Sequence, residues 1–187
     1  MLTAFLSREK PFTEFELLKL WKGLFYCLWM SDKPLAQQNL AREYAAIISK
    51  THDNNTLPFI SAFWVTLVRQ WESIDRYRLD KYYFLVRQMN IAIFNWLNQK
   101  KWDNELLENY NTILYDNVLS PLNHRLPLAI KYHLFDSYLD SLGQSNVSKL
   151  PVEAVVEPFQ KFAKEAKGEQ LKRARSMLND KRWDEYR

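Results

Sequence analysis

The sequence predicts an all-α protein, a HEAT- or armadillo-like stack of about seven helices. Only three of its residues are glycine, too few for the turns of a many-stranded sandwich or barrel. The first helices of successive pairs are expected to start near Thr13, Pro58 and Asp103, with a partial fourth unit from Pro151. Helix pairs that recur every ~40–47 residues are typical of HEAT and armadillo stacks. A compact orthogonal helical bundle is the alternative.

The first two helices are predicted from capping residues and apolar periodicity. Thr13 and Glu16 have the spacing of a capping box, which predicts a helix over 13–29. Its apolar stripe comprises Leu17, Trp21, Leu24 and Leu28. Asp32 and Pro34 open a second helix. Its expected buried residues are Leu40, Tyr44, Ile47 and Ile48.

The middle of the chain is predicted to hold a third and a fourth helix. Residues 51–56 read as a polar loop, and Pro58 opens the third helix, where its missing N–H costs nothing. The expected buried residues of this helix are Ile60, Trp64, Leu67, Trp71 and Ile74. A fourth helix over 76–97 is apolar around most of its circumference, which is typical of a central element. Its inward residues are Leu79, Tyr82, Val86, Met89, Ile93 and Leu97.

Three further helices follow. Asp103 caps a fifth helix, with Leu107, Tyr110, Leu114 and Val118 inward. Pro127 opens a sixth, which carries Ile130, Leu134 and Tyr138 and ends at Gly143. Pro151 starts a seventh, in which Pro158 predicts a kink or a break. The expected organisation is a helical-repeat domain over 1–167 and a basic C-terminal helix or tail over 168–187.

The positive charge of the chain is concentrated near its C-terminal end. The net charge is +4, and residues 160–187 hold nine Lys or Arg and five Asp or Glu. The rest of the chain is therefore neutral. Such a segment either contacts nucleic acid or an acidic surface, or forms a solvated terminal helix.

The sequence offers little for catalysis. The single cysteine, Cys27, cannot form an internal disulfide or a thiolate metal cage, and a core or interface position is expected for it. His133 and Asp136 are one helical turn apart, but a metal site needs further ligands that are not evident. Asp136 and Asp140 are expected to form a solvated acidic face. We therefore expect no enzyme, no cofactor and no small-molecule substrate.

No apolar run approaches the roughly 20 residues of a membrane span. The first residues also lack the apolar region of a secretory signal. These two observations favour an intracellular protein without a membrane partner.

Aromatic and basic side chains are the predicted means of binding. On the first helix, Phe15, Lys19, Lys22, Tyr26 and Trp29 lie opposite the core stripe. They suit a protein or RNA contact, unless neighbouring helices cover them. The complete set of predicted contact residues is Lys19, Lys22, Tyr26, Trp29, Lys33, Arg78, Lys81, Arg87, Lys161, Lys164, Lys172, Arg173, Arg175, Lys181 and Arg182.

The basic residues of the fourth helix differ in whether an acidic residue lies one helical turn away. Arg76 and Asp80 are spaced for a salt bridge at i, i+4. Arg78, Lys81 and Arg87 have no acidic residue at i±4, which makes them the better candidates for phosphate or partner contact.

Two stretches, residues 20–41 and 63–89, resemble the hallmark blocks of the ribosomal RNA processing protein 1 family. They contain the elements Leu-Trp-Lys-Gly-Leu, Trp-Met-Ser-Asp-Lys-Pro and Ile-Asp-Arg-x-Arg-Leu-Asp-Lys in the family's order and approximate spacing. The resemblance implies a non-catalytic, HEAT-like scaffold in the nucleus and nucleolus. It also implies a role in pre-60S particles, in maturation of the large-subunit rRNA precursor. The implied partners are other pre-60S assembly factors, ribosomal proteins and that precursor rRNA.

Overall fold

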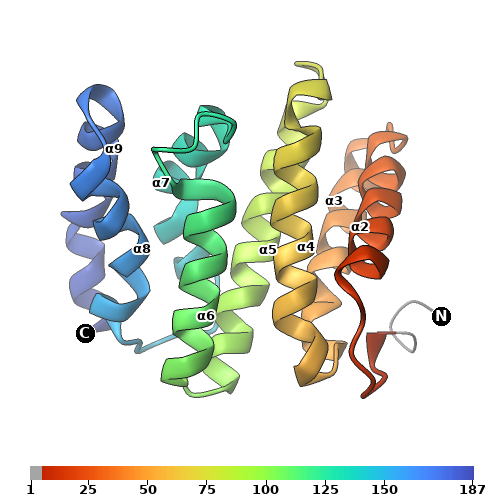
Figure 1. The fold of residues 1–187 in the computed structure, drawn as a ribbon, viewed down its shortest axis with the longest axis horizontal. Helices are drawn as coiled ribbons and strands as arrows, with labels where there is room; N and C mark the ends of the chain where they lie inside the picture. The colour runs from red at the N-terminus through yellow and green to blue at the C-terminus, as the bar shows by residue number, and fades with distance from the viewer. Residues whose placement is uncertain (1–5) are drawn as a thin grey trace. The chain divides into compact units, whose positions relative to one another are not determined.

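The computed structural model describes residues 6–187. They form helices joined by turns and loops, with no strand among them (Figure 1). The chain divides into two compact units, unit 1 up to Ile93 and unit 2 from Phe94 to Arg187. The boundary falls within helix α5, Leu79–Gln99. In the described part of the chain the helices α2 to α9 pack on one another within each unit. The predicted all-α stack of helices is confirmed.

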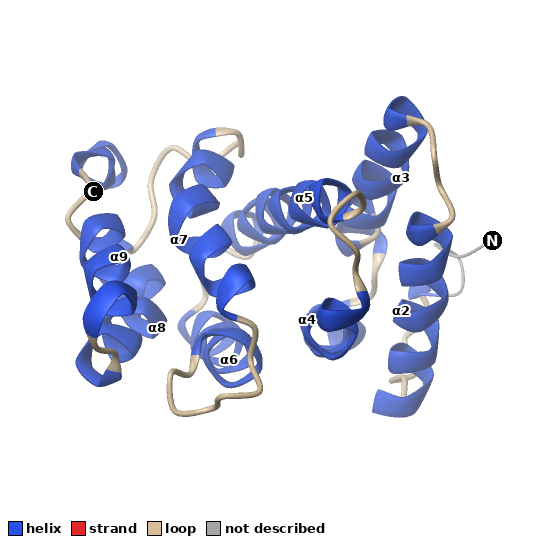
Figure 2. Cartoon of the chain, turned by 90° about the horizontal axis from the view of Figure 1, so that it is seen from above, coloured by secondary structure: helices blue, strands red, loops and turns tan. Residues whose placement is uncertain are grey.

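Unit 1 is built around α2, Glu14–Trp29, which packs against α4, Asp53–Gln70, and α3, Pro34–Ala46 (Figure 2). Two short 3-10 turns follow α3 and α4: η1, Ile48–Lys50, and η2, Trp71–Ser73. The predicted capping box is confirmed, since the Glu16 amide donates to Thr13 Oγ1 at 3.2 Å and the Thr13 amide donates to Glu16 Oε2 at 2.8 Å. These two bonds satisfy free amides at the start of α2.

The core of unit 1 is aromatic. Trp21 packs against the rings of Phe59 and Phe63, with centroids 4.8 and 5.0 Å away, and its indole donates to the Phe59 carbonyl at 2.9 Å. The Tyr82 hydroxyl donates to the Phe25 carbonyl at 2.9 Å. The buried polar groups of Trp21 and Tyr82 therefore each have a hydrogen-bond partner, whereas the buried indole N–H of Trp64 has none within the described residues.

The expected inward residues are buried with two exceptions in unit 1. Leu40 and Leu79 are half-buried, whereas the other apolar residues assigned to the seven predicted helices are buried. Nearly all of the residues that periodicity assigned inward are therefore buried. The core also contains residues outside those stripes, among them Phe25, Phe59 and Phe63.

The predicted loop over 51–56 is wrong. His52 is the N-cap of α4, which begins at Asp53, so Pro58 lies inside the helix rather than at its start. Asn55 is fully buried: its carbonyl oxygen accepts from the Phe12 amide at 2.8 Å, and its amide donates to the Arg8 carbonyl at 2.9 Å. Asn55 is polar because it holds residues 8–12, whereas the hydroxyls of Thr51 and Thr56 donate to carbonyls of residues 47, 51 and 52. The equal spacing of the helix pairs consequently fails at α4.

Unit 2 contains α6, Asn104–Leu114; α7, Leu128–Gly143; α8, Val152–Glu165; and α9, Gly168–Leu178. A π-helical turn, η3, Tyr115–Leu119, extends α6, and a 3-10 turn, η4, Lys181–Tyr186, follows α9. The predicted cap at Asp103 is confirmed by a 3.1 Å bond from the Leu106 amide. Tyr138 lies at the centre of the core, with the rings of Phe94 and Phe159 4.9 and 4.7 Å away.

Pro158 does not break its helix, because a neighbouring helix replaces the bond that proline removes. α8 continues through Pro158 to Glu165. Pro158 has no N–H to offer the carbonyl of Ala154, four residues earlier. The Asn111 side chain on α6 donates to that carbonyl at 2.8 Å instead. Asn111 thus compensates for the proline from another element.

We expect Asn111→Ala to lower the free energy of unfolding by about 1–2 kcal/mol, because the Ala154 carbonyl loses its donor. In a Pro158→Ala background the loss should fall by about 1 kcal/mol, since the new backbone N–H takes over this carbonyl. Urea denaturation of the two single variants and the double variant measures this coupling. Equal losses in both backgrounds would show that the Asn111 bond does not compensate for proline.

None of the helices described over 6–187 is long and apolar enough to cross a membrane.

Candidate functional site

The outward side of α2 is open. Phe15 is 65% exposed and Tyr26 is 44% exposed, and Lys19 and Lys22 are exposed between them. Neighbouring helices therefore do not cover these four side chains, although Trp29 is half-buried. The Lys19 ammonium lies 4.2 Å from the centre of the Phe15 ring, so a cation and an aromatic face are presented together.

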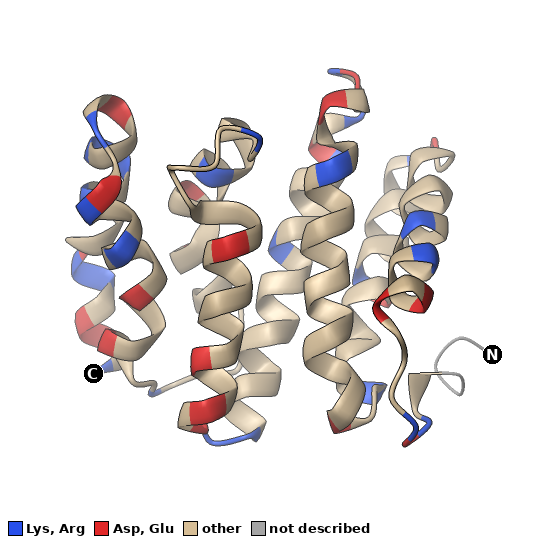
Figure 3. Cartoon of the chain, in the orientation of Figure 1, with Lys and Arg blue, Asp and Glu red and all other residues tan. Residues whose placement is uncertain are grey.

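A groove of about 530 Å³ runs between α2 and α4 beside these residues. We call it the α2–α4 groove; it is lined by Phe15, Leu18, Lys19, Lys22, Thr66, Arg69 and Gln70. Figure 3 shows basic residues on both helices. None of the lining residues is acidic, so the groove carries three positive charges. An anionic partner fits such a surface.

Arg69 is a lining residue that the sequence did not single out. It is exposed near the end of α4. Its position opposite Lys19 and Lys22 follows from the packing of α4 on α2, which periodicity within one helix does not reveal. The signal that the sequence offers is a charged residue between Leu67 and Trp71, two residues of the apolar stripe.

The two sequence blocks meet where α2 ends and α5 begins. Lys81, which is 7% exposed, donates to the carbonyls of Trp29 at 2.7 Å and Ser31 at 2.9 Å. Burial lowers the pKa of the Lys81 ammonium. The last turn of α2 has no basic residue of its own, so Lys81 supplies the positive charge that a helix C-terminus favours.

Arg78 is also engaged at this junction. Its guanidinium pairs with Asp75 and lies 4.9 Å from the centre of the Trp29 ring. The hydrogen bond from Arg78 lowers the pKa of the Asp75 carboxyl. The absence of acidic residues at i±4 therefore does not leave Arg78 or Lys81 without partners. Arg78 pairs with Asp75 at i−3, and Lys81 bonds to one carbonyl at the end of α2 and one just after it.

The predicted salt bridge between Arg76 and Asp80 is wrong. Arg76 precedes α5, which begins at Leu79, so helical i, i+4 geometry does not apply to it. Arg76 donates to the Tyr77 hydroxyl at 2.6 Å and lies 4.6 Å from the centre of that ring. Arg87 is half-buried, 5.6 Å from the ring centre of Phe84.

Lys33 is exposed at the start of α3, and apolar residues are exposed close to it in sequence and at the junction. They are Met30, Leu35 and Tyr77. Exposed apolar and aromatic side chains of this kind suit contact with a protein partner.

The predicted basic residues of unit 2 divide into engaged and exposed groups. Arg173 pairs with Asp136 at 3.0 Å, and Arg182 pairs with Asp140 at 2.6 Å. Asp136 and Asp140 on α7 stay solvent-exposed, as expected, and each also pairs with an arginine from α9 or η4. The Lys161 ammonium lies 3.9 Å from the centre of the Tyr115 ring. The predicted residues that stay exposed outside these two ion pairs are Lys161, Lys164, Lys172, Arg175 and Lys181.

Cys27 is exposed rather than in the core. His52 accepts from the Asn54 amide at 3.3 Å as part of the α4 cap. Within residues 6–187 no three His, Cys, Asp or Glu side chains are grouped as a metal site would require.

An all-α fold with an open aromatic and basic face defines a class of helical proteins suited to binding along their surfaces. The chain belongs to the Nop52 family, since the family model described as "Nucleolar protein, Nop52" matches residues 1–187.

The chain is also similar in sequence to proteins from several animals. The chain is 35% identical over 164 residues to ribosomal RNA processing protein 1 homolog A of Mus musculus, covering 86% of this chain and 33% of that protein. It is 36% identical over 164 residues to ribosomal RNA processing protein 1 homolog B of Homo sapiens, covering 86% and 22%. The Drosophila melanogaster homolog is 30% identical over 152 residues, covering 80% and 22%. The chain therefore spans a third or less of the length of these relatives.

Proposed function

We propose that this chain is a non-catalytic assembly factor in ribosomal RNA processing, acting in nucleolar pre-60S particles. In this proposal its helices form a scaffold that holds the large-subunit precursor rRNA, other assembly factors and ribosomal proteins. The names of its relatives and the nucleolar description of its family support the role and the compartment. Binding rather than chemistry is the expected mode of action.

The α2–α4 groove is the observation that carries the RNA part of the proposal. Lys19, Lys22 and Arg69 present positive charge without a carboxylate in the groove lining. Phosphate neutralisation by such cations dominates the affinity of most RNA contacts. Phe15 and Tyr26 add exposed aromatic faces next to these charges, and unpaired bases stack on faces of this kind. The groove therefore suits single-stranded segments of the precursor.

Reversal of the groove charges tests this proposal. We expect the triple variant Lys19→Glu, Lys22→Glu, Arg69→Glu to bind large-subunit precursor RNA at least tenfold more weakly than the unmodified chain. Each cation that neutralises a phosphate releases counterions, and this release favours binding. The variant replaces three such cations with carboxylates, which repel the phosphates. Filter binding between about 50 and 200 mM salt should also show a shallower salt dependence for the variant.

A matched control separates this effect from a change in total charge. The triple variant Lys50→Glu, Arg125→Glu, Lys149→Glu alters the same number of exposed basic residues elsewhere. It should keep most of the affinity and most of the salt dependence. Equal weakening in both variants, or a flat salt dependence for the unmodified chain, would remove the groove from the proposal.

A helical adaptor that binds only proteins is the second candidate. The exposed side chains of Met30, Leu35 and Tyr77 favour it, as does the pairing of Arg173 and Arg182 within unit 2. Deletion of 168–187 is a poor test because it removes the buried Trp183. The variant Lys172→Glu, Arg175→Glu, Lys181→Glu changes only exposed charges. Unchanged association with pre-60S particles in this variant and in the groove variant would favour the adaptor.

A further inference from the structure

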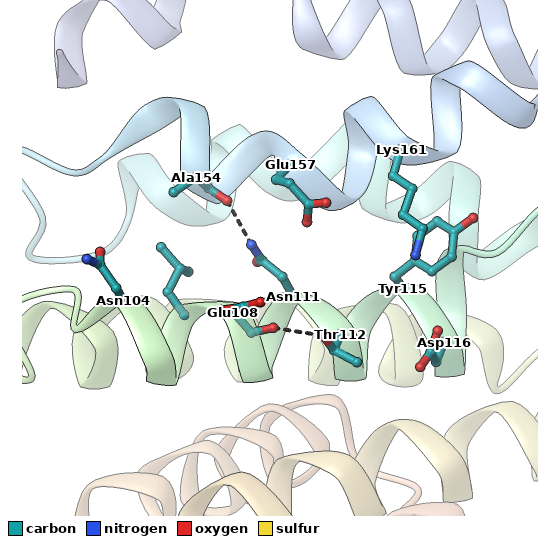
Figure 4. A pocket seen from close by; sticks show the side chains of 10 residues that line it. Asn104, Glu108, Asn111, Thr112, Tyr115, Asp116, Ala154, Glu157 and Lys161 are labelled. Atoms are coloured by element: carbon teal, nitrogen blue, oxygen red, sulfur yellow. Dashed lines mark hydrogen bonds between the residues drawn. The ribbon is translucent and has the colours of Figure 1, made fainter.

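Unit 2 has a groove of its own, about 460 Å³ in volume, between α6 and α8 (Figure 4). We call it the α6–α8 groove. Its polar lining includes Glu108 and Asn111 on α6, Tyr115 and Asp116 on η3, and Glu157 and Lys161 on α8, with Asn104 and Thr112 beside them. Figure 4 shows the Glu157 carboxylate directed from α8 toward α6. None of these residues belongs to the α2–α4 groove.

The charge of this groove is opposite to that of the α2–α4 groove. It is lined by the carboxylates of Glu108, Asp116 and Glu157 and by a single ammonium, that of Lys161. No ion pair engages these three carboxylates within the described residues, although Lys161 is on the same helix as Glu157. The Lys161 ammonium lies over the Tyr115 ring, 3.9 Å from its centre. The groove therefore retains a net negative charge, and its aromatic wall holds a cation.

Asn111 gives a second, independent indication of a donor-bearing ligand. Its side chain is 94% shielded, with 6% of the residue exposed. Its amide nitrogen is used by the Ala154 carbonyl at 2.8 Å, which fixes the orientation of the side chain. Its carbonyl oxygen Oδ1 is buried in the groove lining without a hydrogen-bond partner. A buried acceptor left unpaired costs about 1–3 kcal/mol, so a donor is favoured there.

We propose that the α6–α8 groove binds a basic segment of a protein partner and receives an arginine or lysine side chain between α6 and α8. The unpaired groups are acceptors, and a guanidinium brings five donors and no acceptor. An RNA strand is repelled by the same carboxylates. A divalent cation is a poorer fit, because the described carboxylates do not gather as metal ligands.

Fluorescence anisotropy with a labelled peptide of alternating arginine and serine tests the proposal on the full chain. The unmodified chain should bind this peptide and should not bind its glutamate–serine counterpart. The double variant Glu108→Gln, Glu157→Gln removes two charges and keeps the side-chain shape. Its affinity for the peptide should fall at least tenfold, with circular dichroism unchanged because both side chains are exposed.

Two controls make the outcome decisive. The variant Glu105→Gln, Glu185→Gln removes two exposed charges outside the groove and should bind the peptide as the unmodified chain does. The triple variant of the α2–α4 groove should also keep peptide binding, so this inference stands or falls separately from the RNA proposal. Absence of peptide binding, or equal weakening by both glutamine pairs, would overturn it.

Discussion

Replacement of Lys81 by methionine is expected to lower the free energy of unfolding of unit 1 by about 3 kcal/mol. The Lys81 ammonium donates to two carbonyls, those of Trp29 and Ser31. Hydrogen bonds from a charged donor contribute about 1.5–3 kcal/mol each, and relief of desolvation offsets part of that sum. Methionine preserves the apolar stem but removes this donor from the Trp29 carbonyl at the end of α2 and from the Ser31 carbonyl, which keeps its bond from Gln37.

Urea denaturation followed by tryptophan fluorescence measures this loss. The control is Lys50→Met, because Lys50 is an exposed lysine of the same unit, and it should change stability by less than about 0.5 kcal/mol. Hydrogen exchange should locate the effect, with the amides near the end of α2 losing protection in Lys81→Met. Equal stability of the two variants would mean that the two carbonyls do not depend on Lys81.

Lys81 also connects the two recognisable sequence blocks, which are far apart along the chain. Trp29 and Ser31 belong to the first block, and Lys81 belongs to the second. A hydrogen-bonded ammonium between them fixes the turn after α2 against the start of α5. The exposed side chains of Met30 and Tyr77 therefore lie on backbone segments that these hydrogen bonds hold in place. Lys81 itself, which the sequence predicts to contact a partner, makes internal hydrogen bonds.

Much of the fold is readable from the sequence because its determinants are local. Periodicity places Trp21 and Tyr82 in the core, and the spacing of Thr13 and Glu16 predicts the start of α2. The start of α4 was not readable in this way. Asn55 is polar because it bonds to residues 8–12, far away in sequence. In the sequence alone, such a polar residue cannot be told from a loop residue.

Surface properties were predictable only where a single helix determines them. The exposed row on α2, with Lys19 and Tyr26, follows from the helical period. The positions of Arg69 and Glu157 in their grooves depend on which helices pack together, and the single-sequence pattern does not contain that information. The same limit explains Arg173 and Arg182, whose acidic partners lie 37 and 42 positions earlier in the chain.

The stability of unit 2 should depend on pH through Lys131. This lysine is 2% exposed and donates to the Ser120 carbonyl at 2.8 Å, the residue after the turn η3. Burial lowers the pKa of its ammonium to about 8, whereas a lysine in the unfolded chain has a pKa of about 10.4. Between these values the unfolded state binds more protons than the folded state. Stability therefore rises with pH in this window, by at most about 3 kcal/mol.

Buried tyrosines limit this rise at high pH. Burial raises the pKa of the Tyr110 and Tyr138 hydroxyls above the ordinary value for tyrosine. Above a pH of about 10 the unfolded state loses protons that these folded hydroxyls retain, so stability falls again. We expect a maximum of stability near a pH of about 9.5 to 10, where the contribution of Lys131 is nearly complete.

Lys131→Met isolates the lysine contribution, and comparison with Lys81→Met gives the physical rule. One hydrogen bond from Lys131 does not offset the desolvation of its ammonium, so the methionine variant should be more stable than the unmodified chain by about 1 kcal/mol at neutral pH. Its urea midpoint should rise much less between a pH of about 7.5 and 9.5. Lys81 has two carbonyl partners, and there the same substitution destabilises. The opposite result would be a Lys131→Met variant that is less stable at neutral pH and keeps the pH dependence of the unmodified chain. It would show that the hydrogen bond of Lys131 offsets the desolvation of its ammonium, as the two bonds of Lys81 do.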